Sequence, residues 1–161
     1  MSEPALHDDF RDLLLELQEA GVRFLIVGAH ALAVHGVPRA TGDLDVFVAR
    51  DADNAERLME ALTRFGAPLA SHGVSRRDFE RAGTVYQLGL PPRRIDLLTS
   101  ISGVEFEEAE RSALITEIDG VRLPVLGRRH FVANKLASGR AKDLLDAELL
   151  AQADGEAESK R

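Results

Sequence analysis

Residues 24–30 read Phe-Leu-Ile-Val-Gly-Ala-His, and residues 42–48 read Gly-Asp-Leu-Asp-Val-Phe-Val. The first stretch opens with a short continuous apolar run, which is typical of a buried strand. In the second stretch, aliphatic residues alternate with Asp43, Asp45 and Phe47, so we expect the aliphatic side chains to face the core and these three to point the other way. The two stretches therefore predict two strands of one sheet, connected through a short helix.

Gly28 ends the first predicted strand, and a helix is predicted from Ala29 to His35, closed by Gly36 and Pro38. The first backbone N–H groups of a helix have no partner inside the helix and bind anions, phosphates above all. Glycine lets the backbone approach a phosphate closely. We therefore expect Gly28 and Ala29 to form a phosphate-binding turn just upstream of the alternating strand.

Asp43 and Asp45 occupy positions i and i+2 of that strand, so both point to one face, roughly 6–7 Å apart at their base. Two ionised carboxylates this close repel each other unless a cation lies between them. Hard oxygen ligands favour Mg²⁺ or Mn²⁺, which makes the pair a candidate metal site. An Asp-x-Asp pattern alone is weak, and the alternative is that Asp43 caps a turn while Asp45 is solvated.

Asp96 is a candidate third ligand. It stands between Ile95 and Leu97 in a predicted apolar strand, where burial of an unpaired acid is costly. A shared metal site with the Asp-x-Asp pair would explain its position. The alternative is an ion pair of Asp96 with Arg94 or Arg93.

The other predicted elements surround this unit. The fold class is α/β or α+β, a mixed sheet flanked by helices and followed by C-terminal helices. A single domain is expected at 1–153, with a polar tail at 154–161 that frays. Helices are predicted at 7–20, 51–65, 105–111, 129–138 and 142–153, and strands at 84–90, 94–98, 113–118 and 121–125, the last two joined by a hairpin turn.

The composition bounds the class of protein. The chain has 161 residues, 45% hydrophobic and 29% charged, which is ordinary for one globular domain. The absence of cysteine excludes disulfides, thiolate metal sites and cysteine nucleophiles. No apolar run approaches the roughly 20 residues of a membrane span, and the acidic N-terminus lacks a signal-peptide core. A cytoplasmic protein without membrane contact is therefore expected.

The net charge of −7 is unevenly distributed. Segment 122–142 carries six basic residues and no acid, which indicates either an anion-binding face or a solvated helix surface. The low aromatic content of 5% gives little support for a base-stacking platform.

Three motifs together resemble the nucleotidyltransferase superfamily, and most closely the bacterial minimal nucleotidyltransferases related to abortive-infection and toxin–antitoxin toxins, the AbiEii-like group. The resemblance covers about residues 22–150. One departure is Ala29, which stands where the superfamily has serine or glycine. The first motif is the strand that ends at Gly28. The second is Ala31-x-x-x-His35-Gly36-x-x-Arg39-x-Thr41, which leads to Asp43 and Asp45 and is followed later by Asp96. The third is Lys135, followed by Arg140-x-Lys142-Asp143.

The resemblance implies a metal-dependent enzyme that moves a nucleoside monophosphate from an NTP to an acceptor hydroxyl. Asp43, Asp45 and Asp96 would be catalytic and hold Mg²⁺ or Mn²⁺, and Asp96 would help to deprotonate the acceptor. Asp143 could pair with Arg140 or with Lys135, and in the second case it would hold the lysine in place. The nucleotide-binding residues would be Gly28, Ala29, Arg39, Lys135 and Lys142.

Several of these residues have simpler interpretations. Arg39 could be a solvated loop arginine, Lys135 could extend to solvent along an apolar helix face, and Lys142 could pair with Asp146 one helical turn away. The implied acceptor is a tRNA 3′ end or a protein, and the implied partner is an antitoxin. A second hypothesis is a degenerate, non-catalytic protein of this fold that binds a nucleotide or a partner protein, which Ala29 favours.

Overall fold

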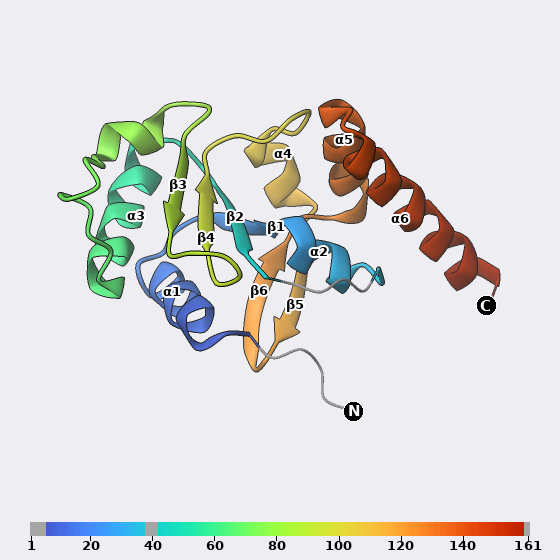
Figure 1. Ribbon diagram of the computed structural model, residues 1–161, viewed down its shortest axis with the longest axis horizontal. Helices are drawn as coiled ribbons and strands as arrows, with labels where there is room; N and C mark the ends of the chain where they lie inside the picture. Colours follow the sequence, from blue (N-terminus) through green and yellow to red (C-terminus); the bar gives the residue numbers. More distant parts are fainter. Residues whose placement is uncertain (1–5, 38–41, 160–161) are drawn as a thin grey trace.

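The computed structural model describes residues 6–37 and 42–159, with side chains up to residue 153. Its centre is a six-stranded mixed sheet with the order β3-β4-β2-β1-β6-β5. Helices cover both faces of the sheet, and the C-terminal helix projects from one end (Figure 1). The predicted fold class is confirmed. The strands are β1 Phe24–Val27, β2 Leu44–Val48, β3 Val85–Leu88, β4 Ile95–Leu98, β5 Leu114–Ile118 and β6 Val121–Val125.

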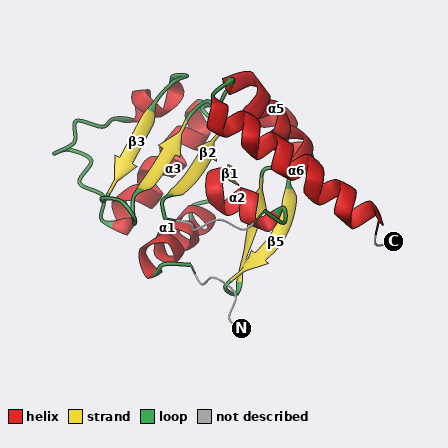
Figure 2. Cartoon of the chain, turned by 45° about the vertical axis from the view of Figure 1, so that its right-hand side comes forward, coloured by secondary structure: helices red, strands yellow, loops and turns green. Residues whose placement is uncertain are grey.

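The helices form the two outer layers. In Figure 2, α1 and α3 lie behind the sheet, while α2, α5 and α6 lie in front of it. A 3₁₀ helix, η1 at Arg76–Glu80, lies where the sequence predicted mostly loop with a turn near Asp78. The α-helices are α1 Asp8–Glu19, α2 Gly28–Val34, α3 Ala52–Phe65, α4 Phe106–Arg111, α5 Arg128–Ser138 and α6 Ala141–Ser159.

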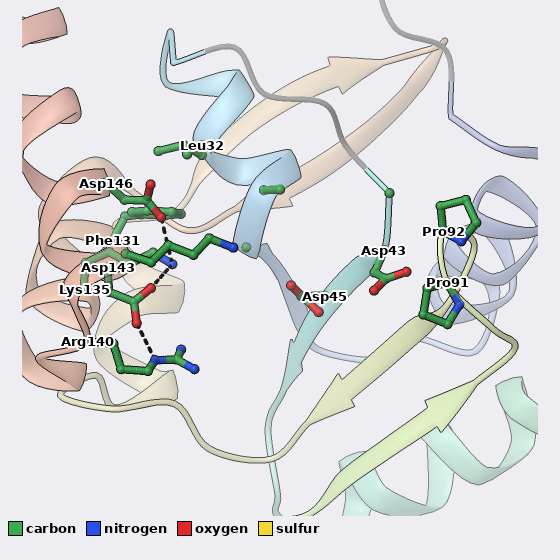
Figure 3. Close-up of a pocket in the computed structure, with 14 residues that line it drawn as sticks. Leu32, Asp43, Asp45, Pro91, Pro92, Phe131, Lys135, Arg140, Asp143 and Asp146 are labelled. Carbon is green, nitrogen blue, oxygen red and sulfur yellow. Dashed lines mark hydrogen bonds and ion pairs between the residues drawn. The ribbon is translucent and has the colours of Figure 1, made fainter.

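Strand register brings distant acids together. β2 pairs antiparallel with β1, with Asp45 opposite Val27, and parallel with β4, with Asp45 opposite Asp96. Paired residues on adjacent strands point to the same face, so Asp45 and Asp96 share a face. Asp43 directly precedes β2 and projects from the same segment (Figure 3). The predicted grouping of the three acids on one face is confirmed.

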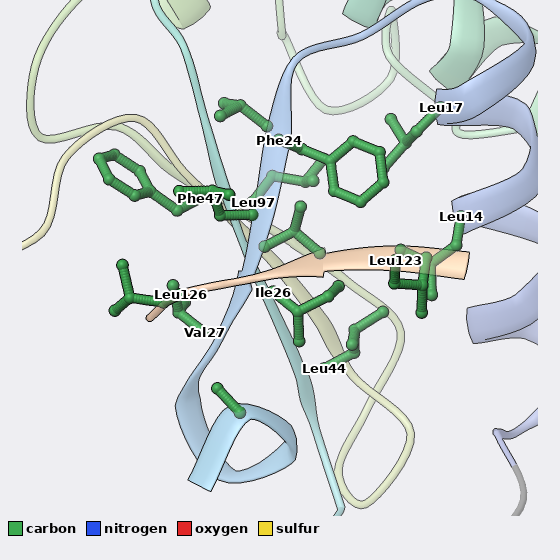
Figure 4. Close-up of a cluster of buried hydrophobic side chains, with 14 of the residues drawn as sticks. Leu14, Leu17, Phe24, Ile26, Val27, Leu44, Phe47, Leu97, Leu123 and Leu126 are labelled. Atoms are coloured by element: carbon green, nitrogen blue, oxygen red, sulfur yellow. The ribbon is translucent and has the colours of Figure 1, made fainter. Parts of the chain in front are cut away.

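The core lies between the sheet and the helices on both sides. Leu14 and Leu17 of α1 pack toward Phe24 and Leu44 on one face (Figure 4). The alternation predicted for β2 holds, but its other face is covered as well. Phe47 is 1% exposed because its ring packs edge-on against Phe106 of α4, with the ring centres 5.1 Å apart.

The C-terminal helices form an antiparallel pair that covers the face carrying the acids. The loop before α4 approaches α5 closely, since a Cβ on Gly103 would stand 3.2 Å from the Ala133 carbonyl oxygen. The α6 backbone continues as helix to Ser159, and fraying of the tail from residue 154 stays a prediction. Among the helices that the structure describes, none has the length and apolar character needed to span a membrane.

Candidate active site

A cavity of about 580 Å³ opens where the acids face the C-terminal helices. Its walls come from the start of α2, the segment entering β2, the β3–β4 loop, α5 and α6 (Figure 3). Most of the residues predicted to bind metal or nucleotide lie on these walls. They are Gly28, Ala29, Asp43, Asp45, Lys135 and Lys142. Asp143, predicted to support Lys135, lines the cavity as well, whereas Asp96 is not among its lining residues.

Gly28 lets the turn after β1 pass directly beneath Asp45. Its φ of +70° lies in the left-handed region that favours glycine. A Cβ built on Gly28 would stand 3.0 Å from both Cβ and Cγ of Asp45 and closer still to one carboxylate oxygen. Ala29 follows at the cavity wall with a methyl group and no hydroxyl. The predicted turn therefore lies at the cavity, with a carboxylate packed against it.

Asp45 lies in a strongly acidic environment. Its partial burial, followed by the charges of Asp96 and Asp43 and a hydrogen bond with Asp96, raises the pKa of Asp45 to about 6, while Arg94 acts in the opposite direction. Asp96 itself is buried, with 8% of the residue exposed. A positive charge reaching this group would favour ionised Asp45.

Arg94 supplies a positive charge among these acids. Its Nε lies 2.9 Å from Oδ1 of Asp96, and one terminal nitrogen lies 3.3 Å from Oδ2 of Asp96 and 3.3 Å from Oδ2 of Asp43. Its backbone N–H also donates to Oδ1 of Asp43 at 3.1 Å. The ion pair of Asp96 with Arg94, which the sequence left open as an alternative, is present.

The donor chemistry suits a hard divalent cation, because three carboxylates lie on one face of two neighbouring strands. The arrangement is nevertheless centred on Arg94. Across the residues that the structure describes, no group of three or more His, Asp or Glu side chains is placed to hold a metal ion. The acids thus share a face as predicted, with Arg94 joining Asp43 to Asp96, and metal binding by Asp43, Asp45 and Asp96 stays a prediction.

Lys135 is anchored on the opposite wall by two buried acids. Its Nζ lies 3.0 Å from Oδ1 of Asp143, 3.6 Å from Oδ2 of Asp146 and 5.1 Å from the ring centre of Phe131. Only 14% of the lysine side chain is exposed. The interpretation that Lys135 extends freely to solvent is therefore wrong.

Asp143 accepts hydrogen bonds from Lys135, Ser138 and Arg140, in keeping with its predicted role of supporting the lysine. Burial acts to raise its pKa, but hydrogen bonds from Ser138, Lys135 and Arg140 outweigh burial and lower the pKa to about 2. Arg140 donates from Nε at 2.7 Å while its side chain stays 79% exposed. Asp143 therefore stays ionised and fixes the lysine at neutral pH.

The basic side chains of segment 122–142 differ in what they contact. Lys135, Arg140 and Lys142 line the cavity. Arg128 instead donates to the backbone carbonyls of Leu150 and His35, which ties α5 to α6 and α2. Arg39, predicted to contact nucleotide, falls outside the described residues.

Sequence reasoning did not assign a site role to Arg94 or Asp146. Arg94 stands two residues before Asp96, so period-two alternation places both side chains on one face of β4, a signal available in the sequence. The contact of Asp146 with Lys135 depends on how α6 packs on α5. Leu32, Phe131, Pro91 and Pro92 add an apolar part of the wall that no motif indicated.

Comparison with known proteins shows the family and the fold of this chain. The family described as "Nucleotidyl transferase AbiEii toxin, Type IV TA system" matches residues 12–161, and the chain belongs to this family. A crystal structure from Thermotoga maritima, provisionally described as a nucleotidyltransferase, is similar over 91% of each chain, with a TM-score of 0.56 and 16% identity. At that identity the likeness shows the fold. A search of curated proteins gives no significant match.

Proposed function

We propose that this AbiEii-family chain is an active nucleotidyltransferase, which transfers a nucleoside monophosphate from an NTP to an acceptor hydroxyl. One observation carries the proposal. Asp45 lies against the Gly28 turn and beside Asp96, and it faces Lys135 across a single cavity. A turn for the triphosphate, a carboxylate pair for the acceptor's proton and a cationic wall thereby lie around one place.

The cationic wall binds the triphosphate in this proposal. Lys142 and Arg140 line the cavity from the start of α6 and meet the outer phosphates. The backbone N–H groups at Gly28 and Ala29 donate to the phosphate nearest the reacting bond. Lys135, held by Asp143, provides a fixed positive charge rather than a mobile one, which lowers the cost of organising the transition state.

The reaction is an in-line displacement. The acceptor oxygen attacks the α-phosphorus, and the bond to pyrophosphate breaks. The proton of the acceptor passes to Asp96 by way of Asp45, which lines both cavities and forms a hydrogen bond with Asp96. When bound, Mg²⁺ or Mn²⁺ held by Asp43, Asp45 and Asp96 would neutralise part of the phosphate charge. Asp45 packs directly over Gly28, and this contact fixes the position of its carboxylate relative to the α-phosphate in the proposed complex.

We place the acceptor in a second cavity of about 230 Å³ that adjoins the first and shares Asp45 and Lys135 with it. Ser100, Ser102 and Asn134 line this cavity with uncharged polar groups, which suit a ribose or side-chain hydroxyl. The acceptor in this proposal is a tRNA 3′ end or a protein. The type IV toxin–antitoxin family also leads us to propose control by an antitoxin.

The alternative is a non-catalytic protein that binds a nucleotide or a partner protein. Ala29 favours it, because the hydroxyl of the superfamily's serine is missing at the phosphate turn. If this alternative holds, Ala29→Ser restores or creates transfer in a chain that otherwise only binds. If the chain is already active, the same substitution leaves transfer equal or faster.

The test is transfer of label from each of four α-³²P NTPs, with Mg²⁺ or Mn²⁺, to total RNA and to a protein extract. We expect one labelled acceptor with wild type and none with Asp45→Asn or Asp96→Asn. Glu108→Gln, an exposed acid on α4, is the matched control and should retain transfer. Binding of NTP without transfer to either fraction would support the non-catalytic alternative.

A further inference from the structure

We propose that Arg94 is a displaceable internal cation, which occupies the space between Asp43 and Asp96 and must release both acids before a divalent cation can bind them. The inference deepens the proposed function, since it takes the three carboxylates as the site for that cation. It adds a residue that controls how tightly the cation binds. Arg94 is a positioning residue here, because it acts through the acids.

The contacts of Arg94 show that its guanidinium is a shared partner of the two acids. Its Nε and one terminal nitrogen donate to the two carboxylate oxygens of Asp96 at 2.9 and 3.3 Å. The same terminal nitrogen lies 3.3 Å from Oδ2 of Asp43. The side chains are 29% exposed for Arg94, 25% for Asp43 and 11% for Asp96. The oxygens that a metal would need are therefore engaged by one cation that solvent can still reach.

The backbone at Arg94 has a separate role. Its N–H holds Oδ1 of Asp43 at 3.1 Å whatever the side chain does. β2–β4 pairing likewise fixes Asp45 opposite Asp96. Release of the guanidinium therefore leaves the acids in place, with oxygens free for a new partner.

Electrostatics makes the two cations mutually exclusive. With Arg94 in place, the three acids and the guanidinium carry at most two net negative charges. A divalent ion between Asp43 and Asp96 would lie within a few ångströms of the guanidinium, where like charges repel strongly at the reduced dielectric of a protein surface. Arginine stays protonated at all working pH values, so the guanidinium has to move rather than lose its proton.

The test is equilibrium binding of Mn²⁺ to the full chain without nucleotide, followed by the electron paramagnetic resonance signal of free Mn²⁺. Arg94→Gln should bind Mn²⁺ at least about fivefold more tightly than wild type, the lower end for coupled sites, because the guanidinium reaches solvent. Arg93→Gln is the matched control. It removes the same charge from an exposed neighbouring residue and should change the affinity less than about twofold.

Each outcome decides the proposal. Equal or weaker Mn²⁺ binding by Arg94→Gln would overturn it and leave Arg94 as an organiser of the acids. Absence of Mn²⁺ binding in both wild type and Arg94→Gln would overturn it as well. If circular dichroism shows that Arg94→Gln does not fold, Arg94→Met replaces it. Methionine keeps much of the length of the side chain and removes its charge, so Mn²⁺ binding should tighten, and unchanged binding by that variant refutes the proposal.

The result is separable from the proposed function. Transfer of label by wild type with no gain in Mn²⁺ affinity for Arg94→Gln would sustain nucleotidyl transfer and reject the displaceable cation. Tighter Mn²⁺ binding by Arg94→Gln without any transfer by wild type would do the reverse.

Discussion

Replacement of Gly28 by alanine tests how tightly the phosphate turn and the acid strand are joined. Gly28 has a φ of +70°, and a Cβ there would meet the side chain of Asp45, with Cβ and Cγ each at 3.0 Å. The variant therefore suffers two separate penalties. One is backbone strain at a positive φ, and the other is a steric conflict that can be relieved only if Asp45 moves.

The two penalties can be separated by a second glycine. Gly73, in the loop after α3, has a φ of +67° and nothing within 4 Å of a built Cβ. Gly73→Ala should pay the strain alone, about 1–2 kcal/mol. Gly28→Ala adds an overpacking cost of about 1–3 kcal/mol, which places it at about 2–5 kcal/mol in all.

Thermal and urea unfolding of both variants measure the difference. For a chain of this size each 1 kcal/mol lowers Tm by about 2–4 °C, so Gly73→Ala should lose about 2–8 °C and Gly28→Ala about 4–20 °C. Gly73→Ala should keep nucleotidyl transfer, while Gly28→Ala should lose it because Asp45 is displaced. Asp45→Ala in the Gly28→Ala background should recover part of the stability. A Gly28→Ala variant no less stable than Gly73→Ala, or with transfer intact, would refute the packing of Asp45 on the turn.

Three further predictions concern the acids, the cationic wall and the core. The pKa of Asp45 is raised from 3.8 to about 6, so the folded protein binds a proton at this carboxyl more tightly than the unfolded chain does. The stability that this protonation contributes is therefore complete below about pH 4 and is lost as the pH rises through about 6. Asp45→Asn should accordingly be more stable than wild type above pH 6, by up to about 3 kcal/mol, with the gap closing toward pH 4 in urea titrations; a gap independent of pH would contradict this. Lys142→Ala should weaken NTP binding in calorimetry without lowering Tm, whereas Lys135→Met should lower both affinity and Tm because it removes the positive charge that two buried acids contact; identical behaviour of the two variants would reject their different roles. Phe47→Ala should cost about 3–5 kcal/mol, since its ring is fully buried, and a loss below 1 kcal/mol in urea unfolding would show that the covering helix is not packed on β2.

Local rules account for the elements and for part of the site. Alternation over 42–48 placed Asp43 and Asp45 on one face, because side chains alternate along any strand. The start of α3 was equally local, since the Asp51 side chain accepts the N–H of Asn54. Gly28 could be singled out because a strand ending in glycine before a helix has few conformations available.

Other parts of the prediction failed where packing overrode the pattern. Phe47 was expected to point away from the core, yet α4 covers that face. The pairing of Lys135 with Asp143 was expected, but local sequence did not show that the lysine is buried, because both of its acidic partners lie on the next helix. A single strand or helix does not specify which neighbour will cover it.

The sequence by itself determined the order of the elements, the strand–glycine–helix turn, the face of the Asp-x-Asp pair and the presence of a basic C-terminal segment, because each follows from neighbours within a few residues. The tertiary structure alone decided that β4 runs beside β2 with Asp96 opposite Asp45, and that α5 brings Lys135 across the cavity. It also decided that Arg94 lies between Asp43 and Asp96. Asp45 and Asp96, like Asp43 and Arg94, are 51 positions apart in the sequence. Burial of apolar surface, which is non-directional and non-local, selects such contacts.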